Sequence, residues 1–160
     1  MSGAAISPDD PRTPDVRRML ARHLEFAAEH SPVEDRHALD VTGLLEPDVS
    51  FFSYRRDGEL LAIGALKALD ADHVEVKSMH TAESARGRGV GRTMVEHLLA
   101  VARARGFRRV SIETGTMAAF APARALYTAA GFEPCPPFGA YVDSPNSTWM
   151  TRELEAEDEP

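Results

Sequence analysis

A glycine-rich turn between a strand pattern and a helix pattern is the feature that most constrains the fold of this chain. An amphipathic helix pattern over 90–105 follows the turn directly, and the turn itself reads Arg86-Gly87-Arg88-Gly89-Val90-Gly91-Arg92. A helix N-terminus exposes N–H groups without partners and the positive end of the helix dipole, and glycines let an anion approach the backbone closely. The turn therefore predicts an anion site, with its arginines binding the same anion.

The spacing of these glycines narrows the choice of anion. It matches neither the G-x-G-x-x-G of dinucleotide-binding folds nor the G-x-x-x-x-G-K-[ST] of the P-loop, which disfavours a dinucleotide or a nucleoside triphosphate. It does match R/Q-x-x-G-x-G/A from Arg86 to Gly91. A solvated loop and an RNA-binding segment remain as alternatives for an arginine-rich glycine turn, although the helix that follows disfavours both.

The periodicity of the remaining sequence predicts a mixed α/β fold without repeats. A helix begins at Thr13-Pro14, and a second short helix is expected to open with the capping box at 31–34 and to end at Gly43 or Pro47. In chain order the other predicted elements are a short strand at 4–7, the first helix up to about residue 29, an antiparallel meander of strands at 49–55, 60–69 and 73–80, the helix at 90–105, a strand at 110–114, a helix at 122–130, and two last strands from Phe132 onward and at 148–153.

Composition and charge exclude several classes of protein. The 160 residues are 43% hydrophobic and 27% charged, which is ordinary for one soluble globular domain, expected to be mobile at 1–12 and 154–160. No apolar stretch approaches the roughly 20 residues of a membrane span, and no signal segment is apparent, so we expect a cytoplasmic protein without a membrane partner. The net charge of −7 disfavours nucleic acid as a partner. No residue spacing is typical of a metal site.

A second motif follows the predicted strand at 110–114. It reads Ala123-Arg124-Ala125-Leu126-Tyr127-Thr128-Ala129-Ala130-Gly131-Phe132. With the turn at 86–92, in this order and separated by a strand, the chain resembles the GNAT superfamily of N-acetyltransferases, in which A-x-x-L-Y-x-x-x-G-F lies on the helix after the fifth strand. The resemblance covers about residues 49–152. The runs 75–81, 113–115 and 145–151 are similar to a bacterial subgroup typed mainly by sequence.

This resemblance implies both a fold and an acyl donor. The implied fold is a mixed, twisted sheet of six or seven strands with helices on both faces, split between the fourth and fifth strands. Acetyl-coenzyme A would lie in the split, with its pyrophosphate on the glycine-rich turn and its pantetheine arm on the backbone of the fourth strand. The implied cofactor-binding residues are Met79, His80, Arg86, Gly87, Arg88, Gly89, Val90, Gly91, Arg92 and Tyr127. Phe120 stands where the family often has an asparagine, so one hydrogen bond to the arm is absent or supplied otherwise.

Transfer to an amine needs a base, an oxyanion site and an acid for the departing thiolate. Tyr127 matches the family tyrosine near the sulfur and is the predicted acid. Glu75 and Glu113 are ranked together as the base, acting directly or through a water, and His80 follows as a base or a substrate contact. The competing interpretations are that Tyr127 is a core residue and that Glu75 and Glu113 lie on a solvated strand face.

Candidate acceptor contacts come from the first two helices and the fourth strand. They are His23, His37 and Lys77, where Lys77 would bind a substrate carboxylate. The competing interpretations are packed or exposed histidines and a lysine that pairs with a neighbouring carboxylate. A small acceptor is favoured because the chain has little length for a peptide-recognition domain.

We therefore expect an acetyl-coenzyme A-dependent N-acetyltransferase acting on a small amine, with an amino-acid-like amine as one candidate. Direct transfer in a ternary complex is expected because the lone thiol, Cys135, lies outside the donor motifs. Two alternatives remain open: an acyl-coenzyme A-binding sensor without transfer, and an interaction module that uses the strand edge or the acidic tail. The last strands of this superfamily often pair between subunits, so the resemblance is also compatible with a homodimer.

Overall fold

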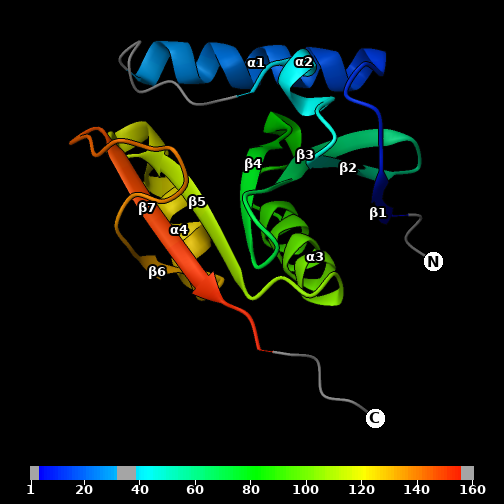
Figure 1. The fold of residues 1–160 in the computed structure, drawn as a ribbon. Coiled ribbons are helices and arrows are strands. Elements are labelled where there is room, and N and C mark those ends of the chain that lie inside the picture. Colours follow the sequence, from blue (N-terminus) through cyan, green and yellow to red (C-terminus); the bar gives the residue numbers. More distant parts are fainter. Residues whose placement is uncertain (1–3, 32–38, 156–160) are drawn as a thin grey trace.

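The computed structural model describes residues 4–31 and 39–155, which form a seven-stranded sheet covered by helices (Figure 1). The order across the sheet is β1-β2-β3-β4-β5-β7-β6. The strands are β1 (Ala4–Pro8), β2 (Val49–Arg56), β3 (Glu59–Ala68), β4 (His73–Thr81), β5 (Arg109–Gly115), β6 (Glu133–Pro134) and β7 (Ser147–Glu153). The helices are α1 (Pro14–His30), α2 (Val41–Leu44), α3 (Val90–Ala104) and α4 (Ala121–Ala129), with short 3-10 turns η2 (Glu83–Ala85) and η3 (Ala118–Phe120).

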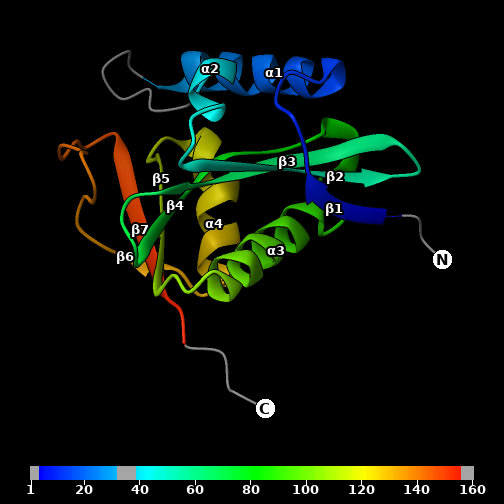
Figure 2. The ribbon, with the colours of Figure 1, turned by 45° about the vertical axis from the view of Figure 1, so that its right-hand side comes forward.

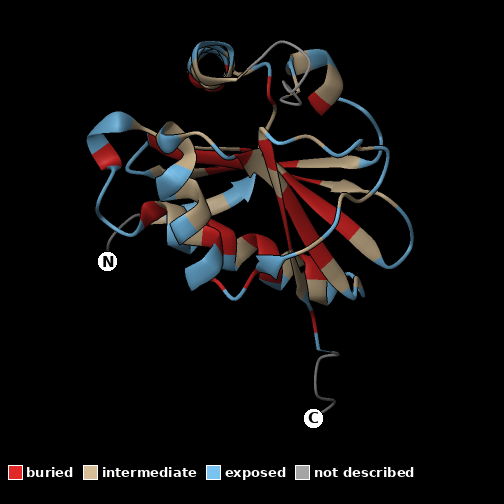
Figure 3. Ribbon diagram, turned by 90° about the vertical axis from the view of Figure 1, so that its left-hand side faces the viewer, coloured by how far each residue is buried: buried red, intermediate tan, exposed pale blue. Residues whose placement is uncertain are grey.

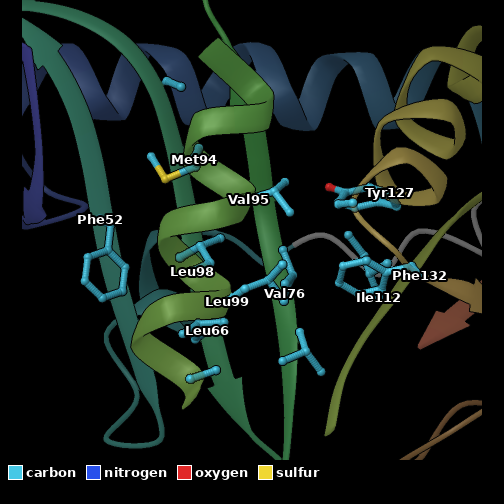
Figure 4. Close-up of a cluster of buried hydrophobic side chains, with 14 of the residues drawn as sticks. Phe52, Leu66, Val76, Met94, Val95, Leu98, Leu99, Ile112, Tyr127 and Phe132 are labelled. Carbon is cyan, nitrogen blue, oxygen red and sulfur yellow. The ribbon is translucent and has the colours of Figure 1, made fainter. Parts of the chain in front are cut away.

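Helices cover both faces of the sheet, as predicted. Helices α1 and α2 lie over one face, and α3 and α4 lie over the other (Figures 1 and 2). A large apolar cluster under α3 and α4 includes Met94 and Leu98, both fully buried (Figure 4). A second cluster under α1 includes Leu20 and Ile63. The strands between these helix layers therefore carry much of the buried surface, as the burial colours in Figure 3 show.

The sheet splits between β4 and β5. These strands are parallel, and their residue pairs in register are His73–Arg109, Val74–Val110 and Glu75–Ser111. Beyond Glu75 the two strands diverge (Figure 1), while β5 stays paired with β7 along its whole length. The predicted split between the fourth and fifth strands is confirmed. It leaves residues 76–81 of β4 with an edge that has no pairing to β5.

A β-bulge in β4 lies beside the split. The residue pairs that flank it are Ile63–His80 and Ala65–Lys77. Between them, Ser78 and Met79 of β4 lie opposite the single residue Gly64 of β3, and Ser78 has a φ of 55°. A Cβ on Gly64 would lie 2.9 Å from the Met79 sulfur and 3.1 Å from Leu98 Cδ1, so a larger residue there would push against the side chains packed over it. The extra residue shifts the alternation of side chains along β4.

Two predicted elements differ in extent from the observed ones. The capping box at 31–34 falls largely in 32–38, outside the described residues, and the described α2 begins after Asp40, whose carboxylate accepts a hydrogen bond from the Gly43 N–H at 2.9 Å. The strand predicted from Phe132 onward is only Glu133–Pro134. The Cys135 N–H still donates to the Trp149 carbonyl at 2.9 Å, but Pro136 and Pro137 follow and have no N–H to donate, so the pairing with β7 stops there.

A pair of histidines connects α1 to the end of β4. The Nδ1 atoms of His23 and His80 are 3.3 Å apart, and the rings meet edge to face. Burial lowers the pKa of both imidazoles to about 4, and the nearby charges of Arg86 and Arg22 contribute to the lowering at His80. Both rings are therefore neutral near pH 7, so that one Nδ1 donates a proton to the other in a hydrogen bond.

This neutral pair predicts that stability falls on acidification. An unfolded histidine titrates near pH 6.5, so between about pH 6.5 and pH 4 the unfolded chain binds more protons than the folded one, and stability present above this window is lost within it. In His23→Gln, we expect the free energy of unfolding to decline less steeply across the window, by about 1 kcal/mol per pH unit. Urea denaturation at a series of pH values measures both slopes. Equal slopes for the two proteins would contradict the assignment.

Candidate active site

A cavity of about 370 Å³ lies where β4 and β5 diverge. Residues of α1, β4, β5, η3 and α4 form its walls. The site residues predicted from the sequence that line it are His23, Glu75, Lys77, Met79, His80, Arg86, Glu113 and Tyr127. The fold thus brings the predicted acid, both predicted bases and two of the three predicted acceptor contacts into one cavity. The third acceptor contact, His37, lies outside the described residues.

The glycine-rich turn begins at the rim of this cavity with Arg86 and leads into α3. Gly87 and Gly89 both have a φ of 77°, a conformation that glycine adopts without strain. The first backbone bond into the helix runs from Thr93 N–H to the Gly89 carbonyl at 3.0 Å. Within the described chain the preceding N–H groups, those of residues 90–92, therefore donate to no backbone carbonyl or capping side chain. These three donors suit a phosphate oxygen.

The arginines of the turn are placed differently. Arg86 is exposed and lines the cavity, and Arg88 is exposed at the turn itself. Arg92 lies along the helix, where its Nε donates to Glu96 at 3.0 Å. Such exposed pairs contribute little to stability, so the pair leaves Arg92 able to exchange partners. Arg86 and Arg88 lie beside the N–H groups of residues 90–92 and are not held by an ion pair of this kind within the described chain.

Tyr127 projects from α4 into the split. Its side chain is buried against Phe132, with ring centroids 5.6 Å apart, and Figure 4 shows the hydroxyl directed towards Val95. Burial raises the pKa of the Tyr127 phenol well above its usual value. The phenol is therefore protonated near neutral pH and can donate a proton inside the cavity.

The floor of the cavity holds a buried ionic cluster. Lys77 Nζ lies 3.2 Å from Glu75 Oε2, and both side chains are largely buried. The Tyr141 hydroxyl donates to the same Glu75 oxygen at 2.5 Å and accepts from Lys77 Nζ at 2.7 Å. Glu75 is thus a paired, hydrogen-bonded carboxylate, which corrects the competing interpretation of a solvated strand face. Lys77 does pair with a neighbouring carboxylate, as its competing interpretation proposed.

Glu113 and Phe120 line the cavity from the β5 side. Glu113 is half-buried on β5, close enough for its charge to contribute to raising the pKa of Tyr141, which burial raises most. The Phe120 ring lies over Gly115, where an added Cβ would come within 2.3 Å of it. Phe26 of α1 meets Phe120 edge to face, with ring centroids 5.3 Å apart. Aromatic rings therefore occupy the side of the cavity between α1 and η3.

Ser78, at the bulge, carries a further unused polar group. Its hydroxyl oxygen is buried, lines the cavity and has no hydrogen-bond partner within the part of the chain that the structure describes. A buried polar atom without a partner is costly, so a ligand in the cavity would relieve it. The unpaired edge of β4, the free N–H groups of the turn and this hydroxyl together fit a ligand with phosphate and amide groups.

Sequence analysis missed Tyr141 and the second cavity that it borders. This cavity, of about 820 Å³, lies under the loop 139–146 and shares Glu75 and Lys77 with the first. The loop contains a single proline, Pro145, and has no hydrophobic periodicity, so the isolated tyrosine is the only signal that the sequence offers. Tyr141 therefore escaped notice although it contacts two predicted site residues.

Neither a metal group nor a membrane span is apparent in the described part of the chain. Residues 4–31 and 39–155 contain no group of three or more His, Cys, Asp or Glu side chains placed to hold a metal ion. None of the helices described there is long and apolar enough to cross a membrane.

Comparison with known proteins agrees with this arrangement. Residues 13–132 match the acetyltransferase (GNAT) family. Over 149 residues the chain is 42% identical to the uncharacterized N-acetyltransferase YsnE of Bacillus subtilis (strain 168), covering 93% of this chain and 99% of that protein. It is also 42% identical over 149 residues to the uncharacterized N-acetyltransferase YedL of Escherichia coli (strain K12), covering 93% of this chain and 94% of that one.

The fold is shared with solved structures. A GNAT family acetyltransferase from Elizabethkingia anophelis, crystallised with acetyl-CoA bound, superposes with a TM-score of 0.67 at 17% identity, covering 96% of this chain and 100% of that chain. At this identity the similarity establishes the fold alone. The family match, the two relatives and the shared split sheet lead to one conclusion: this chain is an enzyme of the GNAT acetyltransferase family.

Proposed function

We propose that this enzyme transfers an acetyl group from acetyl-coenzyme A to the amine of a small molecule. The observation that carries the proposal is the junction of two features: three unpaired N–H groups, at residues 90–92, lie at the end of a turn that begins at the rim of a cavity containing a protonated tyrosine and two carboxylates. An anion site beside an acid–base set is what acyl transfer from a phosphorylated carrier requires. The N-acetyltransferase names of YsnE and YedL support an amine as acceptor.

The donor site is assigned to residues on either side of the split. Acetyl-coenzyme A supplies an acyl group activated as a thioester. The N–H groups of residues 90–92, with Arg86 and Arg88 beside them, suit its pyrophosphate. The backbone of Met79 and His80, on the unpaired edge of β4, suits its amide-containing arm. Because Phe120 carries no amide, we assign hydrogen bonding of the arm to this backbone rather than to the position before α4.

Tyr127 is proposed as the acid for the departing thiolate. It lines the cavity, and burial keeps its phenol protonated at neutral pH. Glu75 and Glu113 are the proposed acceptors of the amine proton, directly or through a water, since both carboxylates line the same cavity. His80 is neutral there and remains a candidate for the same role. One proton is thus taken from the amine and another is given to the sulfur.

The reaction is proposed to be direct, without an acyl-enzyme. Cys135 is not among the residues that line either cavity described above, and burial raises the pKa of its thiol. A protonated thiol outside the site is a poor nucleophile. The acceptor amine would therefore attack the thioester itself while both substrates are bound.

An amino-acid-like acceptor fits the charges of the site. Glu75 and Glu113 favour binding of an ammonium group, and Lys77, although paired with Glu75, places a positive charge in the same cavity near a carboxylate of the acceptor. The cavity of about 370 Å³ also has to hold the acyl end of the donor. These features favour a small acceptor that carries both charges.

Removing the arginines of the turn tests the donor site. In Arg86→Ala/Arg88→Ala, we expect the Kd for acetyl-coenzyme A to rise about 10- to 100-fold, because two charge-assisted contacts to phosphate are lost. Isothermal titration calorimetry measures the Kd. The matched control is Arg17→Ala/Arg18→Ala, which removes two exposed arginines from α1 and should bind as the wild type does. Equal affinity of all three proteins, or no binding by any, would overturn the donor site.

Removing the Tyr127 hydroxyl tests the acid. In Tyr127→Phe, we expect kcat for thiol release across an amine panel to fall about 100-fold, while the Kd for acetyl-coenzyme A changes less than about threefold, because the ring still packs against Phe132. The control Tyr54→Phe removes a hydroxyl from β2, outside the cavity-lining set. A wild-type kcat in Tyr127→Phe would exclude the acid role. Binding by the wild type without turnover of any amine would instead favour an acyl-coenzyme A sensor.

A further inference from the structure

Tyr141 connects the loop 139–146 to the floor of the active-site cavity. Its hydroxyl donates to Glu75 Oε2 and accepts from Lys77 Nζ, across 66 and 64 residues of sequence. Lys77 Nζ also lies 5.4 Å from the centre of the Tyr141 ring. One phenol thus contacts both members of the buried ion pair of β4.

We propose that Tyr141 is a positioning residue for Glu75, and that it fixes Glu75 as the carboxylate that receives the proton of the acceptor amine. This inference rests on the proposed acetyl transfer to an amine. Tyr141 acts through Glu75 and takes no proton itself. The proton passes from the amine nitrogen to Glu75, directly or through one water, as the new nitrogen–carbon bond forms.

The hydrogen bonds determine which oxygen of Glu75 is available. Both donors, the Tyr141 hydroxyl and Lys77 Nζ, bind the same oxygen, Oε2. Within the described chain no hydrogen bond reaches Oε1, and Glu75 lines the cavity. The Tyr141 and Lys77 contacts therefore hold the carboxylate in one orientation and leave its second oxygen for the amine or a water. A carboxylate held this way loses little orientational freedom during the reaction.

The protonation state of the phenol is consistent with a donor. Burial raises the pKa of the Tyr141 phenol above its usual value, and the charges of Glu75 and Glu113 raise it further. Tyr141 therefore keeps its proton near neutral pH and donates it in the hydrogen bond to Glu75. The titratable or charged groups around Glu75 on the elements packed against it are His73 and Lys77 on β4, Lys67 on β3, Glu113 on β5 and Tyr141 in the loop.

Packing keeps Tyr141 in place independently of its hydroxyl. Its ring meets Phe138 edge to face at 5.2 Å between centroids, and Phe138 in turn contacts His73 at 5.6 Å. A change to phenylalanine would therefore remove the hydrogen bonds while it leaves the ring contacts. Because the Tyr141 ring packs on Phe138 and its hydroxyl binds Glu75, the position of the loop 139–146 affects the orientation of the Glu75 carboxylate.

A double-mutant cycle tests the proposal. In Tyr141→Phe, we expect kcat for acetyl transfer to fall about 10- to 100-fold, which corresponds to the loss of a hydrogen bond to a charged group. In Glu75→Gln, kcat should fall further, and adding Tyr141→Phe to Glu75→Gln should change it less than about twofold, because a residue that acts through Glu75 has nothing left to position. Independent, multiplying losses would overturn the proposal, as would a wild-type kcat in Tyr141→Phe.

The dependence of kcat/KM on pH gives a second test. It would not change if Tyr141 only packed against its neighbours. The charged form of Glu75 loses a donor in Tyr141→Phe, so the acidic limb of kcat/KM should move to higher pH. An unshifted limb with a lower kcat would overturn the proposal, and this measurement needs no Glu75 variant. Tyr54→Phe is the control and should keep both the rate and the limb of the wild type. Absence of turnover by the wild-type enzyme would refute the proposed function itself, whereas turnover with an unshifted limb refutes only the role of Tyr141.

Discussion

The end of backbone pairing between β4 and β5 after Glu75 is the constraint on which the rest of the site depends. A strand edge inside a protein leaves N–H and C=O groups that must find other partners. Here residues 76–81 present that edge to a cavity instead of to β5. The glycine-rich turn starts at the same cavity with Arg86, and within residues 4–31 and 39–155 its N–H groups at 90–92 donate to no backbone carbonyl or capping side chain. One elongated ligand with amide and phosphate groups can satisfy both sets of donors.

The bulge in β4 determines which side chains reach this cavity. Without the extra residue, strict alternation would place Lys77 and Met79 on one face and Ser78 and His80 on the other. With it, His80 comes onto the α1 side, where its Nδ1 meets His23 at 3.3 Å. Gly64 opposite the bulge leaves room for the Met79 side chain, whose sulfur would lie 2.9 Å from an added Cβ. A change of register by one residue on one strand thus joins α1 to the site.

The parts of this structure that sequence predicts well are those whose signals are local. The predicted helix at 90–105 is observed as Val90–Ala104 and the predicted strand at 73–80 as His73–Thr81, because hydrophobic periodicity and flanking glycines mark both. The motifs likewise predicted that residues 86–92 and Tyr127 would meet at one split. Tyr141 was not predictable, because its partner Glu75 is 66 residues away and the loop that carries it has no periodicity. Non-local polar contacts of this kind leave no pattern in a single sequence.

Neighbouring groups distinguish the proposed acid from the proposed base within one cavity. Burial alone raises the pKa of the Tyr127 phenol, which therefore keeps its proton near neutral pH. Glu75 is as deeply buried, yet it receives hydrogen bonds from a lysine and a phenol, contacts that stabilise the charged carboxylate against the cost of burial. In the proposed mechanism the two side chains take opposite roles, because Glu75 accepts hydrogen bonds from two donors whereas burial keeps the Tyr127 phenol protonated. That difference comes from the placement of Lys77 and Tyr141, so the loop that carries Tyr141 belongs to the proposed active site as much as β4 does.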